Sequence, residues 1–273
     1  MLPLVDKPII QYGVEEAVAS GVDNIIIVTG RGKNAIEDHF DVNIELESFL
    51  ESRNKTEQLE QVRKISNMIK VAYVRQGEPL GLGHAVLVTS ELVGNEPFAV
   101  ILADDVIDAD PPALKQMISV YEKVGGPVLA VERVPADQVS SYGIVDIDES
   151  EKPGDGIHLV RDLVEKPAVK DAPSNLAIIG RYILTPDIFP ALRATASDAT
   201  GEIQLTNGLK RLLRERKIYA YEVAGSRHDT GNKLGYLQAV VYFALRRDDL
   251  GDAFRKYLRS ENIERRSTFR NGK

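Results

Sequence analysis

The sequence contains no cysteine among its 273 residues. This absence excludes disulfide bonds, thiolate zinc sites and a cysteine nucleophile. Long hydrophobic runs are missing too, since no apolar stretch approaches the roughly 18 residues that a membrane-spanning helix needs. The first residues, MLPLVDK, lack the charged and then apolar profile of a signal peptide. We therefore expect a cytoplasmic protein.

Basic residues are in the minority, with 34 Lys and Arg against 41 Asp and Glu, and the formal net charge is −7. An acidic surface repels the phosphate backbone of a nucleic acid, so the composition gives no sign of nucleic-acid binding. Small phosphorylated ligands are still compatible with this charge, because a few local cations or a metal ion can neutralise them.

Four short apolar runs, at residues 24–29, 69–74, 98–102 and 127–131, alternate with helical patterns. The runs are too continuous to have one polar face, which is typical of strands buried on both faces of a parallel sheet. This alternation of strands and helices predicts an α/β protein with a Rossmann-like, doubly wound and mostly parallel sheet.

Three other regions complete the predicted organisation of a single domain, residues 1–273. Residues 41–66 are polar and charged, and we expect a helical insertion there. Residues 142–182 are rich in strand patterns, which predicts a small antiparallel β subdomain against the carboxyl ends of the parallel strands. Residues 232–260 carry apolar stripes at helical spacing and predict C-terminal helices.

Carboxylates follow two of the predicted strands. Asp104 and Asp105 come directly after residues 98–102, and Asp229 follows the apolar run at 218–223. Ligands of open α/β sheets bind beyond the carboxyl ends of the strands, where two carboxylates suit a hard cation such as Mg²⁺. Each carboxylate could instead cap a helix or close a turn. His228 is expected to pack rather than to bind a metal, because no second histidine or cysteine accompanies it.

Glu165 and Lys166 end a predicted strand ahead of a proline, and Gly143 begins another. A lysine is a compact cation suited to a phosphate, and a carboxylate can accept hydrogen bonds from sugar hydroxyls. An exposed charge pair before a turn is the alternative interpretation. For Gly143 the alternatives are a backbone N–H that binds a sugar oxygen and a simple tight turn.

Residues 76–85, QGEPLGLGHA, form a glycine-rich turn between a strand and a helix. Glycines let a ligand approach the backbone, and the following helix N-terminus favours anions. The turn has neither the Walker nor the Rossmann spacing. Gln76 carries both a donor and an acceptor on one amide, which suits the edge of a nucleobase.

Taken in order, these segments resemble the bacterial UTP–glucose-1-phosphate uridylyltransferases, also called UDP-glucose pyrophosphorylases, a branch of the sugar nucleotidyltransferases. The resemblance covers nearly the whole chain and is carried by the stretches MLPLVDKPIIQY, NIIIVTGRGKNAIEDHFD, QGEPLGLGHAV, ADDVI, SSYGIV, LVEKP, GRYILTPDIF, GEIQLTN and DTGNKLGYLQA. It implies transfer of a uridylyl group from UTP to glucose 1-phosphate, which gives UDP-glucose and pyrophosphate. It also implies a homo-oligomer, dimer or tetramer, with the C-terminal helices as contact surfaces.

The resemblance implies a role for each candidate residue. Asp104 and Asp229 would hold Mg²⁺ and, together with Lys166, would form the catalytic set. Lys166 would bind the phosphate of glucose 1-phosphate, and Glu165 would bind the sugar hydroxyls. The other implied substrate contacts are the backbone N–H of Gly143 to the sugar, and Gln76 and Gly81 to the uracil.

In the family, a buried strand and a glycine-rich loop with basic residues precede the stretch that resembles MLPLVDKPIIQY. That loop holds the triphosphate, so the resemblance predicts that the 273-residue chain by itself is nearly inactive and less stable than a longer form. Two alternatives stay open: a nucleotidyltransferase for another nucleotide and sugar 1-phosphate, and a non-catalytic protein that binds nucleotide sugars.

Overall fold

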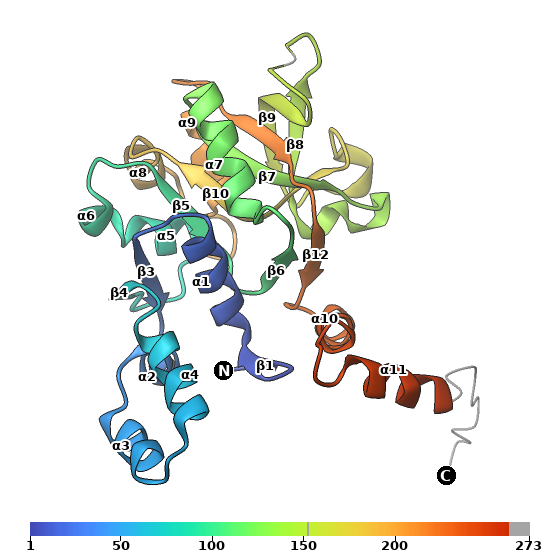
Figure 1. The fold of residues 1–273 in the computed structure, drawn as a ribbon. Helices are drawn as coiled ribbons and strands as arrows, with labels where there is room; N and C mark the ends of the chain where they lie inside the picture. The colour runs from blue at the N-terminus through green and yellow to red at the C-terminus, as the bar shows by residue number, and fades with distance from the viewer. Residues whose placement is uncertain (152, 262–273) are drawn as a thin grey trace, which may run out of the picture.

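The computed structural model describes residues 1–151 and 153–261. Figure 1 shows its elements, which in chain order are β1 (Pro3–Leu4), β2 (Lys7–Pro8), α1 (Ile9–Ala19), β3 (Asn24–Thr29), α2 (Asn34–Phe40), α3 (Ile44–Ser52), α4 (Thr56–Ser66), β4 (Lys70–Arg75), α5 (Leu82–Leu87), α6 (Ser90–Val93), β5 (Phe98–Ile101), β6 (Asp105–Asp108), α7 (Ala113–Val124), β7 (Val128–Arg133), η1 (Ala136–Ser141), β8 (Gly143–Asp148), β9 (Ile157–Glu165), η2 (Val169–Asp171), β10 (Leu176–Leu184), α8 (Ile188–Arg193), α9 (Leu205–Leu212), β11 (Tyr219–Glu222), β12 (Ser226–Asp229), α10 (Lys233–Leu245) and α11 (Gly251–Ser260).

The main sheet has six strands in the order β5-β10-β7-β11-β9-β8. β7 and β11 are parallel, and β10 runs antiparallel to β5 and β7 and also pairs with β8 at one position. β5, β7 and β11 therefore point the same way and end at one edge of the sheet. β3 and β4 form a separate parallel pair, and β6 and β12 form an antiparallel pair.

The α/β class is confirmed, but the strand arrangement differs from the mostly parallel sheet that we expected. Among the described residues, parallel pairing is confined to β3–β4 and β7–β11. β10 is buried along its whole length and lies between β5 and β7, antiparallel to both. We expected antiparallel strands within residues 142–182, but an apolar run carries no information about strand partners, so the insertion of β10 between β5 and β7 is not visible in the sequence pattern. Region 142–182 thereby adds β8, β9 and β10 to the main sheet.

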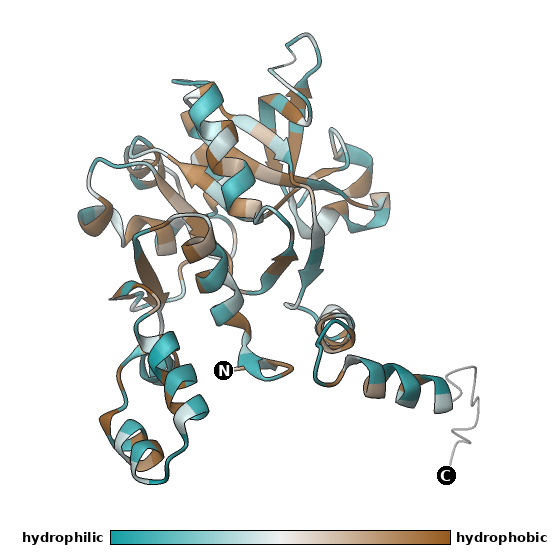
Figure 2. Ribbon diagram, viewed as in Figure 1, coloured by the Kyte–Doolittle hydropathy of each residue, from teal (hydrophilic) through white to brown (hydrophobic). Residues whose placement is uncertain are grey.

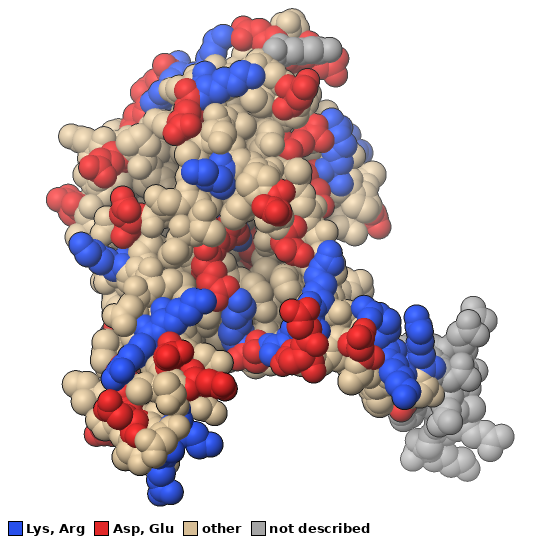
Figure 3. Space-filling view, viewed as in Figure 1, with Lys and Arg blue, Asp and Glu red and all other residues tan. Residues whose placement is uncertain are grey.

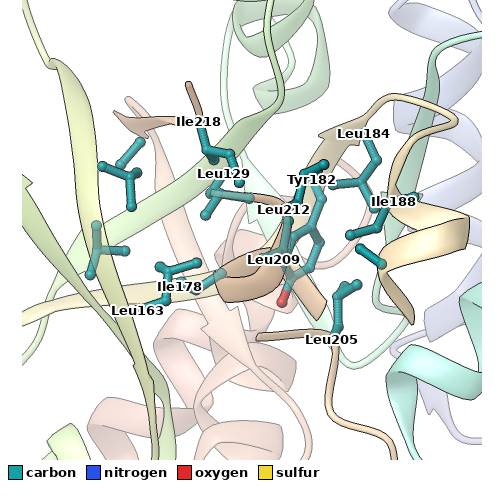
Figure 4. Close-up of a cluster of buried hydrophobic side chains, with 14 of the residues drawn as sticks. Leu129, Leu163, Ile178, Tyr182, Leu184, Ile188, Leu205, Leu209, Leu212 and Ile218 are labelled. Carbon is teal, nitrogen blue, oxygen red and sulfur yellow. The ribbon is translucent and has the colours of Figure 1, made fainter. Parts of the chain in front are cut away.

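Helices cover both faces of the main sheet. Alternate residues of β7 point to opposite faces, as the pleat requires. Leu129 and Val131 belong to a core with α5, α8 and α9, whereas Val128 and Ala130 belong to a core with α1 and α7. Figure 4 shows the first core, and Figure 2 shows hydrophobic colours along β3, β7 and β10 against a largely polar α4.

Helix α1 is joined to the main sheet by a buried ion pair. The Arg181 guanidinium of β10 donates to the Glu16 carboxylate at 3.0 and 2.8 Å, and the two side chains are 1% and 7% exposed. Helices α2–α4 and α10–α11 project from opposite sides of the body in Figure 1. In the described part of the chain, no helix has the length and apolar character needed to cross a membrane.

Candidate functional site

Asp104 and Asp229 are held together by the turns on which they lie. Asp229 ends β12 opposite Asp105 of β6, and Asp104 is in the turn between β5 and β6. The backbone N–H and the hydroxyl of Thr230 both donate to the Asp104 carbonyl, at 2.8 and 2.7 Å. The Gly231 N–H donates to Asp229 Oδ1 at 2.9 Å. These hydrogen bonds hold the turn of Asp104 against the end of β12, where Asp229 lies.

Gly231 gives a measure of the separation between the two carboxylates. A Cβ at this position would lie 3.0 Å from Asp104 Oδ2 and 3.1 Å from Asp229 Oδ1, so the two oxygens lie within about 6 Å of each other. A side chain at residue 231 would occupy the space between the carboxylates. The glycine keeps that space open.

The electrostatics of this pair favour a cation. Partial desolvation raises the pKa of Asp104, and the neighbouring carboxylates of Asp105 and Asp229 raise it further. The ionised form is therefore disfavoured unless a positive charge offsets it. Within residues 1–151 and 153–261 no cluster of three or more His, Cys, Asp or Glu side chains could hold a metal. This donor set suits a cation such as Mg²⁺, which binds one or two carboxylates and takes its other ligands from water and phosphate.

Asp105 is turned away from this pair and has a structural role. Its carboxylate accepts from the Gly180 N–H at 2.8 Å and from Arg227 at 2.6 and 3.1 Å. Burial opposes the charge of Arg227, but the hydrogen bonds and the charge of Asp105 raise its pKa. Arg227 is not among the candidate residues that the sequence predicts. Its spacing is the one signal for it, because residues two apart on a strand share a face and Arg227 precedes Asp229 by two.

His228, between these two residues, is packed as expected. Its ring contacts Tyr242 and Phe243, with centroids 4.2 and 5.4 Å away. Burial lowers the pKa of His228 and favours the neutral ring.

Glu165, Lys166 and Gly143 meet at one end of the β8–β9 pair. Gly143 lies opposite Glu165 in the strand register. A Cβ on Gly143 would lie 2.8 Å from Thr206 Oγ1 and 3.2 Å from Glu165 Oε2, so this position excludes a side chain. Lys166 has a φ of 44°, which is strained for a non-glycine residue and is frequent at functional sites. Its ammonium is 3.6 Å from Glu165 Oε1, and the side chain is 55% exposed.

Glu165 and Lys166 line a cavity of about 690 Å³ together with Asp198, Thr200, Glu202, Gln204, Asn207 and Lys210. A second cavity of about 470 Å³ lies between α1, β6 and α10. Its arginines are already paired, Arg246 with Asp108 and Arg247 with Asp6 and Asp249. It contains none of the candidate residues. The candidate site is therefore the first cavity together with the carboxylates of Asp104 and Asp229.

Tyr142 connects the cavity to the carboxylate pair. Its carbonyl accepts from the Lys166 N–H at 3.0 Å, and its hydroxyl is 3.5 Å from Asp229 Oδ2. The Arg227 guanidinium lies 5.2 Å from the centre of the Tyr142 ring. Tyr142 thus contacts the backbone of Lys166 on one side and the carboxylate of Asp229, a candidate cation ligand, on the other.

Gln76 and Gly81 are also brought together. The Gln76 side-chain amide donates to the Gly81 carbonyl at 3.2 Å and lies 2.9 Å from His84 Nδ1. Gly81 has a φ of 90°, and a Cβ there would lie 2.9 Å from Glu202 Cβ. The glycine-rich turn therefore packs against a wall of the cavity. On the face that Figure 3 draws, acidic and basic side chains of the described residues are interspersed, without an extended basic patch.

Comparison with known proteins gives consistent matches. Residues 1–244 match the family described as nucleotidyl transferase. A UTP–glucose-1-phosphate uridylyltransferase of Bacillus subtilis (strain 168) is 48% identical over 252 residues, which cover 92% of this chain and 85% of that protein. A crystal structure of UDP-glucose pyrophosphorylase complexed with UDP-glucose is 44% identical, with a TM-score of 0.81 and 90% of each chain covered. A UTP-bound UGPase from Acinetobacter baumannii is 39% identical, with a TM-score of 0.86, covering 94% of this chain and 90% of that chain.

Proposed function

We infer that this chain, which belongs to the UTP–glucose-1-phosphate uridylyltransferases of the nucleotidyl transferase family, transfers a uridylyl group from UTP to glucose 1-phosphate. The products are UDP-glucose and pyrophosphate. The observation that carries the inference is the identity of 48% over 92% of the chain. The site geometry supports it, because Tyr142 connects a cavity that contains Lys166 to the carboxylates of Asp104 and Asp229.

The chemistry requires positioning more than proton transfer. A phosphate oxygen of glucose 1-phosphate is ionised at neutral pH and attacks the α-phosphorus of UTP without a general base. The new oxygen–phosphorus bond forms as the bond to the pyrophosphate oxygen breaks, and the pyrophosphate leaves with its electron pair. The protein has to align the two substrates and neutralise the charge on both.

Each side chain has a role that suits its surroundings. Lys166 holds the sugar phosphate, and the Glu165 carboxylate accepts hydrogen bonds from the sugar hydroxyls. Gly143 allows the sugar to approach the backbone. At the other wall, Gln76 and Gly81 meet the uracil, and the carbonyl of Gly81 already orients the Gln76 amide.

Asp104 and Asp229 would hold the divalent cation, and we propose Mg²⁺. The raised pKa of Asp104 and the open space beside Gly231 support this role. When bound, the ion would neutralise phosphate charge. Thr230 and Gly231 keep the two carboxylates in place through their hydrogen bonds.

A homo-oligomer, dimer or tetramer, is part of the proposal and is supported by the exposed apolar residues of α10. Leu234 and Leu237 are 66% and 60% exposed. A cytoplasmic location follows from the proposed substrates, which are phosphorylated metabolites.

Changing Lys166 to Ala tests the proposed pocket. The variant removes a point charge that faces one substrate only, so we expect glucose-1-phosphate binding to weaken by tenfold or more and UTP binding to change by less than twofold. Isothermal titration calorimetry measures both. Lys170 is exposed in η2, four residues beyond Lys166, and Lys170→Ala is the matched control. Equal losses for the two ligands would mean that Lys166 is structural.

A further inference from the structure

The loop that precedes α9 is organised around one carboxylate. Asp198 Oδ1 accepts hydrogen bonds from the Thr200 N–H at 2.8 Å, the Thr200 hydroxyl at 2.6 Å and the Glu202 N–H at 3.1 Å. The Asp198 N–H donates back to the Glu202 carbonyl at 2.9 Å. Asp198 Oδ2 accepts a further bond, from the Gln204 side-chain amide at 2.9 Å.

The Gln204 amide connects Asp198 to Glu202. Its nitrogen donates to Asp198 Oδ2 and to Glu202 Oε2, both at 2.9 Å. Glu202 lines the same cavity as Glu165 and Lys166. The orientation of the Glu202 carboxylate therefore depends on Gln204, and that of Gln204 depends on Asp198.

The same loop also supports the glycine-rich turn. The Ile203 N–H donates to the Leu80 carbonyl, and the Gly83 N–H donates to the Ile203 carbonyl, both at 2.8 Å. Glu202 Cβ packs against Gly81, where even a methyl group would clash. The hydrogen bonds from Thr200 and Gln204 lower the pKa of Asp198 and favour its ionised form, which is the form that accepts all of these bonds.

We propose that Asp198 is a positioning residue for sugar recognition: through Gln204 it aims Glu202 at a hydroxyl of the hexose phosphate, and through the loop backbone it holds the Gly81 turn. The proposal rests on the proposed function of the cavity. Asp198 also lines the cavity, but both of its carboxylate oxygens are taken up by the loop and by Gln204, so we assign it a positioning role. The Oδ1 atom of Asp198 accepts the hydrogen bonds that hold the loop. Its Oδ2 atom accepts the bond from Gln204, which orients Glu202.

This division allows the two roles to be separated by mutation. Asp198→Asn keeps an oxygen for the three Oδ1 bonds but places an amide nitrogen opposite the Gln204 nitrogen, so only the link to Glu202 is lost. UDP-glucose binding should weaken about tenfold, because the misdirected Glu202 carboxylate loses its hydrogen bond to a sugar hydroxyl. UDP, which lacks the glucose, should bind within twofold of the parent. Asp198→Ala loses both roles and should weaken the binding of both UDP-glucose and UDP.

Two further variants complete the calorimetric test. Gln204→Leu should reproduce the effect of Asp198→Asn, and the double variant should be no worse than either single variant, because both break one path. Asp148 makes the same two bonds to Ser150 at the far end of β8, so Asp148→Asn should leave both affinities unchanged. Melting temperatures verify that each variant is folded.

An unchanged UDP-glucose affinity in Asp198→Asn would overturn the proposal, as would additive losses in the double variant. Lys166→Ala separates this failure from a failure of the proposed function. If Lys166→Ala weakens glucose-1-phosphate binding and Asp198→Asn has no effect on UDP-glucose, only the role of Asp198 is wrong. If the parent chain binds no UDP-glucose, the proposed function itself fails.

Discussion

Asp104 and Asp229 lie 125 residues apart in the sequence and meet beside Gly231, within about 6 Å of each other. Their meeting could be predicted because each follows a predicted strand, and strand ends share one edge of a sheet. The role of Arg227 could not be predicted, because this role is to neutralise the carboxylate of Asp105. That carboxylate is buried, needs a counter-charge, and is turned toward Gly180 by the β6–β12 pairing. Adjacent aspartates in a sequence give no indication of which one faces the solvent.

The raised pKa of Asp104 has a consequence for stability. Its ionised form is less favourable in the folded protein than in the unfolded chain, so its contribution is best at acidic pH and is lost as the pH rises through the folded-state pKa. At pH 7 without metal, Asp104→Asn should therefore melt at the same temperature as the parent or higher. Below pH 4 the difference should disappear. Thermal melts at the two pH values measure it.

Magnesium adds the control for this variant. Mg²⁺ should raise the melting temperature of the parent and leave that of Asp104→Asn unchanged, because a ligand stabilises only the form that binds it. A metal-free variant that melts well below the parent at pH 7 would show that Asp104 is a structural residue rather than a cation ligand.

At the scale of elements, strand positions follow from local sequence and strand partners do not. The predicted runs at 24–29, 69–74, 98–102 and 127–131 correspond to β3, β4, β5 and β7 within two residues at each end. The reversed position of β10 depends on contacts far apart in the sequence. Arg181 of β10 reaches Glu16 of α1 across 165 residues, and no local pattern encodes that pair.

Glu16→Gln tests how strongly α1 is attached to the sheet. The substitution keeps the shape but leaves the Arg181 guanidinium buried without its counter-ion, a change that typically costs about 3–5 kcal/mol. Urea unfolding should show a loss of this size. Glu15, the neighbouring residue on α1, pairs with Lys7 at a more exposed site, so Glu15→Gln should cost under about 1 kcal/mol. Similar small losses in both variants would mean that the buried pair does not anchor α1.

At the scale of the whole molecule, α10 presents apolar residues away from the body. Leu234, Leu237 and Val241 share one face at helical spacing and are 66%, 60% and 36% exposed. Exposed apolar side chains grouped in this way commonly mark contact surfaces. The sequence predicted this stripe from its periodicity, but the same pattern equally describes a helix that packs against its own core.

The double variant Leu234→Glu, Leu237→Glu should be monomeric where the parent is a dimer or tetramer, because two charges would be buried in the contact. Light scattering after size-exclusion chromatography gives the masses. Ile44 of α3 is 73% exposed, and Ile44→Glu should keep the mass of the parent. If the parent is monomeric, or if the double variant has the parent's mass, α10 does not form the contact between subunits.

The central claim is that Asp229, Asp104 and the cavity around Lys166 form one site for uridylyl transfer. The most direct measurement is UDP-glucose formation from UTP and glucose 1-phosphate, quantified by anion-exchange chromatography at high protein concentration. We predict Mg²⁺-dependent formation by the parent and a loss of at least about 100-fold in Asp229→Asn, since the variant removes charge neutralisation at the transition state. UDP-glucose formed equally by both proteins, or by neither, would contradict the account.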